Sequence, residues 1–231
     1  MTIRDLSNIV EKTCCIIPMY NEEQVIFEVI TNLKSFFPHI LCIDDGSSDN
    51  SAFLAEKAGA QVIRHAVNIG QGASLATGFQ WVQQNAKFLY IVTFDADGQH
   101  RPEDACKLVK ELDNKDLDVV FATRFLEYTK SSVPIMKRLV LRSVSRLNNS
   151  MTGSKLSDAH NGLRALTVEA SRSICITQNG MAHATQFVSL VLQLNLKYTE
   201  LPVTVLYTTY SRSKGQSLMN SINIVLDLLW E

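Results

Sequence analysis

FLYIVTFDADGQHRPE, residues 88–103, carries the local pattern from which the fold can be predicted. Its first eight residues form an apolar run that is too short for a helix and rich in β-branched and aromatic side chains, which predicts a buried strand. The run ends at Asp95, Asp97 follows two residues later, and Pro102 then suits the opening of a helix predicted over 103–113. The stretch therefore predicts a strand, an acidic loop and a helix in succession.

The same succession recurs through the first half of the chain. Short apolar runs predict buried strands at 13–19, 39–44, 60–65, 88–95 and 117–123. Amphipathic segments between them predict helices at 22–36, 49–58, 71–86 and 103–113. This alternation favours right-handed βαβ units, so the predicted fold class is α/β with a mostly parallel central sheet flanked by helices.

The second half predicts a different arrangement within the same domain. Helical patterns occupy 134–151, 167–175 and 183–195, and 197–207 predicts a strand. Because no Pro/Gly/Ser-rich linker interrupts the chain, we expect a single domain over 1–231. Its parts are a first half at 13–123, a second half at 124–217 and an amphipathic tail helix at 218–231.

Composition narrows the class of protein. The chain has 231 residues, 46% of them hydrophobic and 19% charged, with a net charge of −1. This balance excludes collagen-like, disordered and disulfide-scaffold proteins and gives no basic field for nucleic acid. The five cysteines include no CxxC pair, which is typical of reduced thiols in a cytoplasmic protein. No apolar run reaches the ~18 residues of a spanning helix, and the N-terminus lacks the apolar centre of a signal peptide.

Polar and acidic residues follow three of the predicted strands directly, at 20–22, 44–49 and 95–100. Since ligands of open parallel sheets bind beyond the carboxyl ends of the strands, we expect these clusters to share one edge. Asp95 and Asp97 could hold a divalent cation that bridges a diphosphate, and their oxygen ligands suit Mg²⁺ or Mn²⁺. The alternative is a set of turns in which Asp and Gly serve loop geometry. The segment 68–72 lacks the third glycine of a dinucleotide loop and predicts no phosphate loop by itself.

Six segments together resemble family 2 glycosyltransferases, which have the GT-A fold. They are IIPMYNEE (16–23), IDDGSSDNS (43–51), NIGQGAS (68–74), FDADGQH (94–100), DAHNGLRAL (158–166) and SRSKGQS (211–217). FDADGQH and NGLRA are similar to the dolichyl-phosphate mannose synthase and polyprenyl-phosphate sugar transferase branch. The resemblance implies an inverting, metal-dependent transfer of a sugar from a nucleotide-diphosphate sugar. The implied acceptor is a polysaccharide, a lipopolysaccharide or a polyprenyl phosphate used in building the cell envelope.

The resemblance also implies roles for individual residues. The implied nucleotide-sugar pocket comprises Pro18, Tyr20, Asn21, Glu22, Asp44, Asp45, Gly70, Asp95, Ala96, Arg212 and Lys214. The metal, Mg²⁺ or Mn²⁺, would be held by Asp95, Asp97 and Gln99. Catalysis would involve Asp97, Arg124 and Asp158. Asp158 would act as a general base toward a sugar hydroxyl, whereas an ionised lipid phosphate needs no base and leaves Asp158 to position or cap.

Several features leave alternatives open. His160 stands where the polyprenyl-phosphate branch has a small residue. Arg138, Arg142 and Arg146 share one helix face, which is either a solvated face or a contact for lipid phosphate and an anionic membrane. The tail helix either packs, forms a homo-oligomer interface or lies at a membrane surface. We expect a cytoplasmic protein, with peripheral contact at the inner face of the membrane as the sharper hypothesis.

Two other functions compete with sugar transfer. A sugar-phosphate nucleotidyltransferase also places carboxylates and a metal on a related sheet, but it uses a glycine-rich, arginine-containing loop after the first strand. Here that position is occupied by residues 20–23, YNEE. The third possibility is a non-catalytic module that binds a sugar nucleotide without turnover.

Overall fold

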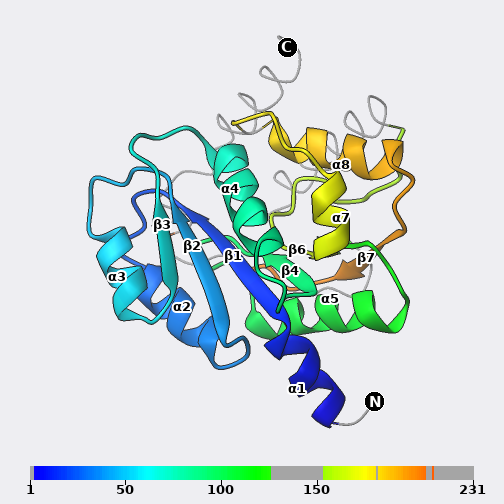
Figure 1. Ribbon diagram of the computed structural model, residues 1–231, viewed down its shortest axis with the longest axis horizontal. Coiled ribbons are helices and arrows are strands. Elements are labelled where there is room, and N and C mark those ends of the chain that lie inside the picture. Colours follow the sequence, from blue (N-terminus) through cyan, green and yellow to red (C-terminus); the bar gives the residue numbers. More distant parts are fainter. Residues whose placement is uncertain (1–2, 126–152, 181, 207–209, 211–231) are drawn as a thin grey trace.

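The computed structural model describes residues 3–125, 153–180, 182–206 and 210 (Figure 1). Seven strands form one sheet in the order β3-β2-β1-β4-β6-β5-β7. The strands are β1 (Thr13–Met19), β2 (His39–Asp44), β3 (Gln61–Arg64), β4 (Tyr90–Thr93), β5 (Val119–Thr123), β6 (Arg164–Thr167) and β7 (Tyr198–Pro202). The helices are α1 (Ile3–Glu11), α2 (Ile26–Lys34), α3 (Ser51–Lys57), α4 (Gln71–Gln83), α5 (Pro102–Asn114), α7 (Val168–Ser173) and α8 (His183–Gln193).

Parallel pairing dominates this sheet, which confirms the predicted α/β class. Strand β1 pairs in parallel with β2 and β4, β2 with β3, and β5 with β7. Strand β6 is the exception, because it runs antiparallel to both β4 and β5 and separates them. We predicted no strand at 164–167, since four residues that begin with a charged side chain carry neither the length nor the apolar pattern of a buried strand.

Helices cover both faces of the sheet, and the side chains of β1 point alternately toward one face and the other. Cys15, Ile17 and Met19 point into one apolar core, which they share with α1, α2 and α5. Cys14 and Ile16 point into the other, which α4, α7 and α8 cover (Figure 1). A strand with helices on both sides reads as a continuous apolar run, and this is why its position could be predicted. All five cysteines carry free thiols, and three of them are buried.

Some expectations fall outside the described residues. These are the helix at 134–151 with its three arginines, the residues Arg212 and Lys214, and the tail helix at 218–231. In the part of the chain that the structure describes, no helix combines the length and apolar character needed to cross a membrane. The strand predicted at 197–207 is shorter in the structure, because β7 ends at Pro202.

Candidate active site at the carboxyl edge of the sheet

The residues after β1 and β2 form a single hydrogen-bonded unit. Asn21 adopts φ 53°, and its side-chain oxygen accepts a hydrogen bond from the Ser48 amide at 2.9 Å. In return, the Asn21 amide donates to the Ser47 hydroxyl at 2.9 Å, and the Glu22 amide donates to the Ser51 hydroxyl at 2.6 Å. The two acidic loops predicted to meet at one edge are therefore interlocked, and the ring of Tyr20 beside them is exposed.

Asp44 and Asp45 serve their own loops. Fully buried Asp44 accepts from the Ser47 amide at 3.0 Å and lies 3.0 Å from the Arg64 guanidinium. Asp45 contacts His65 Nδ1 at 2.8 Å and accepts from two backbone amides, those of Ile69 and Gly70. Burial opposes the ionisation of Asp45, but these hydrogen bonds outweigh it and lower its pKa below the ordinary value.

Gly70 and Gly72 are required by close packing at the start of α4. A Cβ on Gly70, which has φ 110°, would lie 2.2 Å from the Asn179 carbonyl oxygen. A Cβ on Gly72 would lie 1.9 Å from the Gln178 carbonyl oxygen, and the Gly72 amide donates to Asn179 at 2.8 Å. These glycines let the segment 178–180 approach the helix, which explains glycine here without a phosphate loop. The predicted nucleotide role of Gly70 remains a prediction.

Asp95 and Asp97 follow β4 at the same edge. Asp95 Oδ2 contacts His100 Nε2 at 2.9 Å, and Asp97 Oδ1 accepts from the Gln99 amide at 3.0 Å. Burial opposes ionisation of Asp95, yet His100 and the nearby charge of Arg164 lower its pKa. Burial, followed by the charge of Asp95, raises the pKa of Asp97 to about 6. The predicted neighbours of this pair, Ala96 and Gln99, are both buried.

Glu22 lies in the loop after β1, and after burial and the charge of Asp95, its own charge adds to the raised pKa of Asp97. Tyr210 lies over the same place. Its hydroxyl donates to Glu22 Oε2 at 2.7 Å, and burial together with this carboxylate raises its pKa. The sequence pattern did not single out Tyr210, since a tyrosine in a polar segment carries no periodic signal.

Arg124 and Asp158 form a buried ion pair. Arg124 follows β5, and its Nε and Nη2 atoms donate to Asp158 Oδ2 and Oδ1 at 2.6 and 3.1 Å. The Arg124 amide and the side chain of Asn161 also donate to Asp158. The two side chains are 9% and 2% exposed. The carboxylate predicted as a candidate base is thus paired on both of its oxygens.

A second buried arginine was missed by sequence reasoning. Arg164, at the start of β6, is 2% exposed and lies 4.6 Å from the centre of the Phe187 ring. Burial lowers its pKa to about 10, while the charges of Asp95 and Asp158 act in the opposite direction. A charged residue inside the apolar run LRAL was a signal for a buried arginine. His160 and His183 lie near it, and burial lowers the pKa of each to about 4.

This edge of the sheet places carboxylate oxygens, which are hard ligands, beside the side chains of two buried arginines. Among the described residues, no group of three or more His, Cys, Asp and Glu side chains is arranged to hold a metal ion. A cation on Asp95 and Asp97 would therefore need further oxygen ligands, which a diphosphate supplies.

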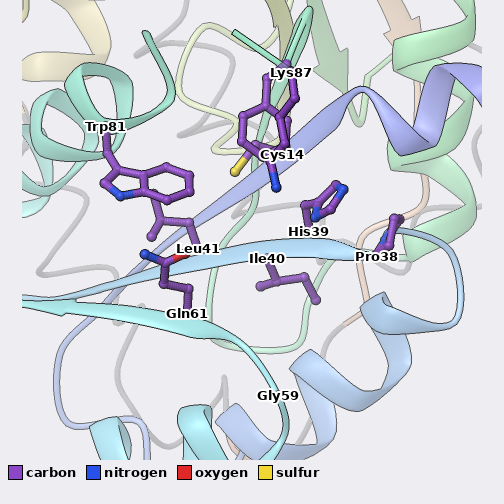
Figure 2. A pocket seen from close by; sticks show the side chains of 10 residues that line it. Cys14, Pro38, His39, Ile40, Leu41, Gly59, Gln61, Trp81 and Lys87 are labelled. Atoms are coloured by element: carbon purple, nitrogen blue, oxygen red, sulfur yellow. The ribbon is translucent and has the colours of Figure 1, made fainter. Parts of the chain in front are cut away.

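A cavity of about 140 Å³ opens at the opposite end of the strands (Figure 2). Its walls come from the starts of β1, β2 and β3, from α4 and from the segment before β4. The lining residues are Cys14, Pro38, His39, Ile40, Leu41, Gly59, Gln61, Trp81, Lys87 and Phe88. None of the residues predicted to bind substrate lines this cavity.

Comparison with known proteins connects this geometry to a family. The model of glycosyl transferase family 2 matches residues 14–175. A UDP-N-acetylglucosamine–dolichyl-phosphate N-acetylglucosaminyltransferase of Methanococcus voltae is 27% identical over 235 residues, which cover 93% of this chain and 93% of that protein. An undecaprenyl-phosphate 4-deoxy-4-formamido-L-arabinose transferase of Salmonella paratyphi B is 30% identical over 237 residues, 95% of this chain and 67% of that protein.

Among solved structures, glucosyl-3-phosphoglycerate synthase from Mycobacterium tuberculosis resembles this chain, with a TM-score of 0.74 at 18% identity. The match covers 99% of this chain and 83% of that one, which was solved in complex with Mn²⁺, UDP and glucosyl-3-phosphoglycerate. At this identity the likeness concerns the fold, and it confirms the predicted GT-A architecture.

Proposed function

The chain belongs to glycosyl transferase family 2, and on that premise we propose that it transfers a sugar from a nucleoside-diphosphate sugar to a polyprenyl phosphate or a similar acceptor. The observation that carries this proposal is geometric: the loops after β1 and β2 are interlocked by hydrogen bonds, and Asp95 and Asp97 follow β4, which pairs in parallel with β1, at the same carboxyl edge. The names of two relatives, which specify dolichyl-phosphate and undecaprenyl-phosphate, support the class of acceptor.

Asp95 and Asp97 fit a divalent cation, Mg²⁺ or Mn²⁺. Their oxygens are the hard ligands such cations prefer. Burial and, after it, repulsion from Asp95 raise the pKa of Asp97, and a cation would offset both. When bound, it would neutralise charge that develops on the departing nucleoside diphosphate. Gln99 lies beside the pair, but its contribution here is the backbone amide that orients Asp97.

The donor would lie over the interlocked loops after β1 and β2. Tyr20 is exposed at these loops, Asn21 and Glu22 are half-buried in them, and Pro18 lies just before them in β1. Asp44 and Asp45 would then act by holding these loops and the segment 65–70 in place, since Asp44 Oδ1 and both Asp45 oxygens have hydrogen-bond partners within the protein and Asp44 Oδ2 is paired with Arg64. Arg212 and Lys214 stay candidates for closing over the donor.

The Arg124–Asp158 pair favours a positioning role for Asp158 over general base catalysis. A base that deprotonates a sugar hydroxyl needs an oxygen open to that hydroxyl, and both oxygens here accept from Arg124. A lipid phosphate is already ionised, so its oxygen can attack the anomeric carbon without a base. In an inverting transfer that new bond forms on the face opposite the breaking bond to the diphosphate.

Product analysis tests this function. The purified chain is incubated with Mn²⁺, a polyprenyl phosphate and UDP-, GDP-, dTDP- or CDP-sugars in turn. We expect one donor to yield free nucleoside diphosphate and a glycolipid in equal amounts. Release of pyrophosphate would instead indicate nucleotidyl transfer, and binding without release of either product would indicate a non-catalytic module.

A matched pair of variants assigns the activity to this site. Asp97→Asn removes one carboxylate of the pair, whereas Asp116→Asn changes an exposed carboxylate whose partner is Lys197. We expect activity to be lost in the first variant and kept in the second. Equal turnover by wild type and Asp97→Asn would overturn the assignment.

A further inference from the structure

Gly162 lies against the Asp95 carboxylate without the space for a side chain. An ideal Cβ at Gly162 would lie 2.2 and 2.3 Å from the two carboxylate oxygens and 2.5 Å from Cγ of Asp95. The backbone of Gly162 is outside the left-handed region, so its conformation does not demand glycine. Glycine is therefore required here by the nearby Asp95 carboxylate and not by the backbone conformation.

The contact is held from both sides. The Thr93 hydroxyl donates to the Gly162 carbonyl at 2.6 Å, which ties the turn at 158–163 to β4, the strand that precedes Asp95. On the other side, His100 contacts Asp95 Oδ2 at 2.9 Å, is 7% exposed and lies edge-on to Phe94. Asp95 thus lies between a fixed imidazole and a fixed peptide.

The same turn also contacts Asp158, a buried carboxylate of the site. Asn161 donates from its side chain to Asp158 at 3.3 Å and accepts from the Leu163 amide at 3.1 Å. Consecutive residues 161 and 162 therefore contact Asp158 and Asp95 respectively. A short turn in the second half of the chain touches a carboxylate on each side of the site.

We propose that Gly162 is a positioning residue, whose missing side chain sets the orientation of the Asp95 carboxylate. The steric part of this inference stands on the contact alone. Its consequence for donor and metal binding rests on the proposed function, in which Asp95 and Asp97 hold the cation and the diphosphate. Residues that orient ligating carboxylates influence metal affinity or activity by about 10- to 100-fold.

The variant Gly162→Ala tests the consequence. The added methyl meets the movable end of a side chain and no backbone atom among its nearest neighbours, so the chain should fold with the carboxylate displaced. We expect binding of Mn²⁺ with UDP, followed by the electron paramagnetic resonance of free Mn²⁺, to weaken about 10- to 100-fold. Gly180→Ala is the control, because a Cβ there would meet nothing within 4 Å. It should bind Mn²⁺ and UDP like the wild type.

A double-mutant cycle tests the steric part independently of function. Gly162→Ala should lower the melting temperature of the wild-type chain but leave that of an Asp95→Ala chain unchanged, since the methyl then occupies the space of the missing carboxylate. An equal loss in both backgrounds, or wild-type binding of Mn²⁺ and UDP by Gly162→Ala, would overturn the proposal. If the wild type binds neither Mn²⁺ nor UDP, the functional consequence is overturned, whereas the cycle still decides the steric contact.

Discussion

Replacing Asp97 by asparagine should stabilise the metal-free chain at neutral pH while it removes activity. Burial and the charge of Asp95 raise the pKa of Asp97 from 3.8 to about 6. Because the folded chain then holds this proton more tightly than the unfolded chain, ionisation favours unfolding. The destabilisation is absent below about pH 4, grows as the pH rises and is complete above about pH 6.

The size of the effect follows from these two values. A difference between 3.8 and about 6 corresponds to at most about 3 kcal/mol, and solvent reaches this half-buried side chain. We therefore expect a gain of about 1 to 3 kcal/mol, or about 3 to 10 °C in melting temperature for a chain of this length. Asparagine keeps an oxygen that can accept from the Gln99 amide, so that hydrogen bond is not lost.

Calorimetry in EDTA at about pH 7.5 and about pH 4.5 measures this difference. Asp97→Asn should melt higher than wild type at the upper pH and by only about a third of that margin at the lower one, and its turnover with Mn²⁺ should fall by about 100-fold or more. In Asp116→Asn no such gain is expected, because Lys197 lowers the pKa of that exposed carboxyl. A variant that melts lower than wild type at the upper pH would show that Asp97 stabilises its loop, and the interpretation as a ligand site would be wrong.

Three further outcomes are expected. Asp158→Ala leaves the buried Arg124 guanidinium without its partner and should cost about 3 to 5 kcal/mol in urea unfolding; a loss below about 1 kcal/mol would contradict the buried pair. Chelation of divalent ions should stop nucleoside diphosphate release and added Mn²⁺ should restore it, whereas equal rates in EDTA would exclude the metal. Tyr210→Phe removes the hydrogen bond to Glu22 and should lower the free energy of unfolding in urea by about 1 kcal/mol, whereas an unchanged value would contradict that bond. The same change at Tyr198 serves as its control.

The parts of the fold that could be predicted are those determined by a local sequence pattern. Strand β1 is a run of seven mostly buried residues, and its neighbours in the sheet share that character, so position and direction follow from the sequence. The four residues of β6 become a strand only because β4 and β5 pair with them on both sides. Such pairing is a property of the assembled sheet, and no local pattern announces it.

The candidate site divides in the same way. The acidic clusters after the strands could be found because each follows an apolar run directly. Which side chains pair with one another could not be found, since Arg124 and Asp158, although both were named, are 34 residues apart and Tyr210 is 188 residues from Glu22. The contact between Asp45 and His65 could not be predicted from the sequence either, because it depends on how the segment after β3 turns back.

The direction of β6 has a consequence for how this site is assembled. In a sheet of parallel strands, the segments that follow the strands lie at the carboxyl edge, and the segments that precede the strands lie at the opposite end. By running the opposite way between β4 and β5, β6 begins at that edge. The segment 158–163, which precedes β6, therefore lies beside the loop of Asp95 and Asp97, which follows β4. One reversed strand gives the site a wall that a wholly parallel sheet has no means of supplying.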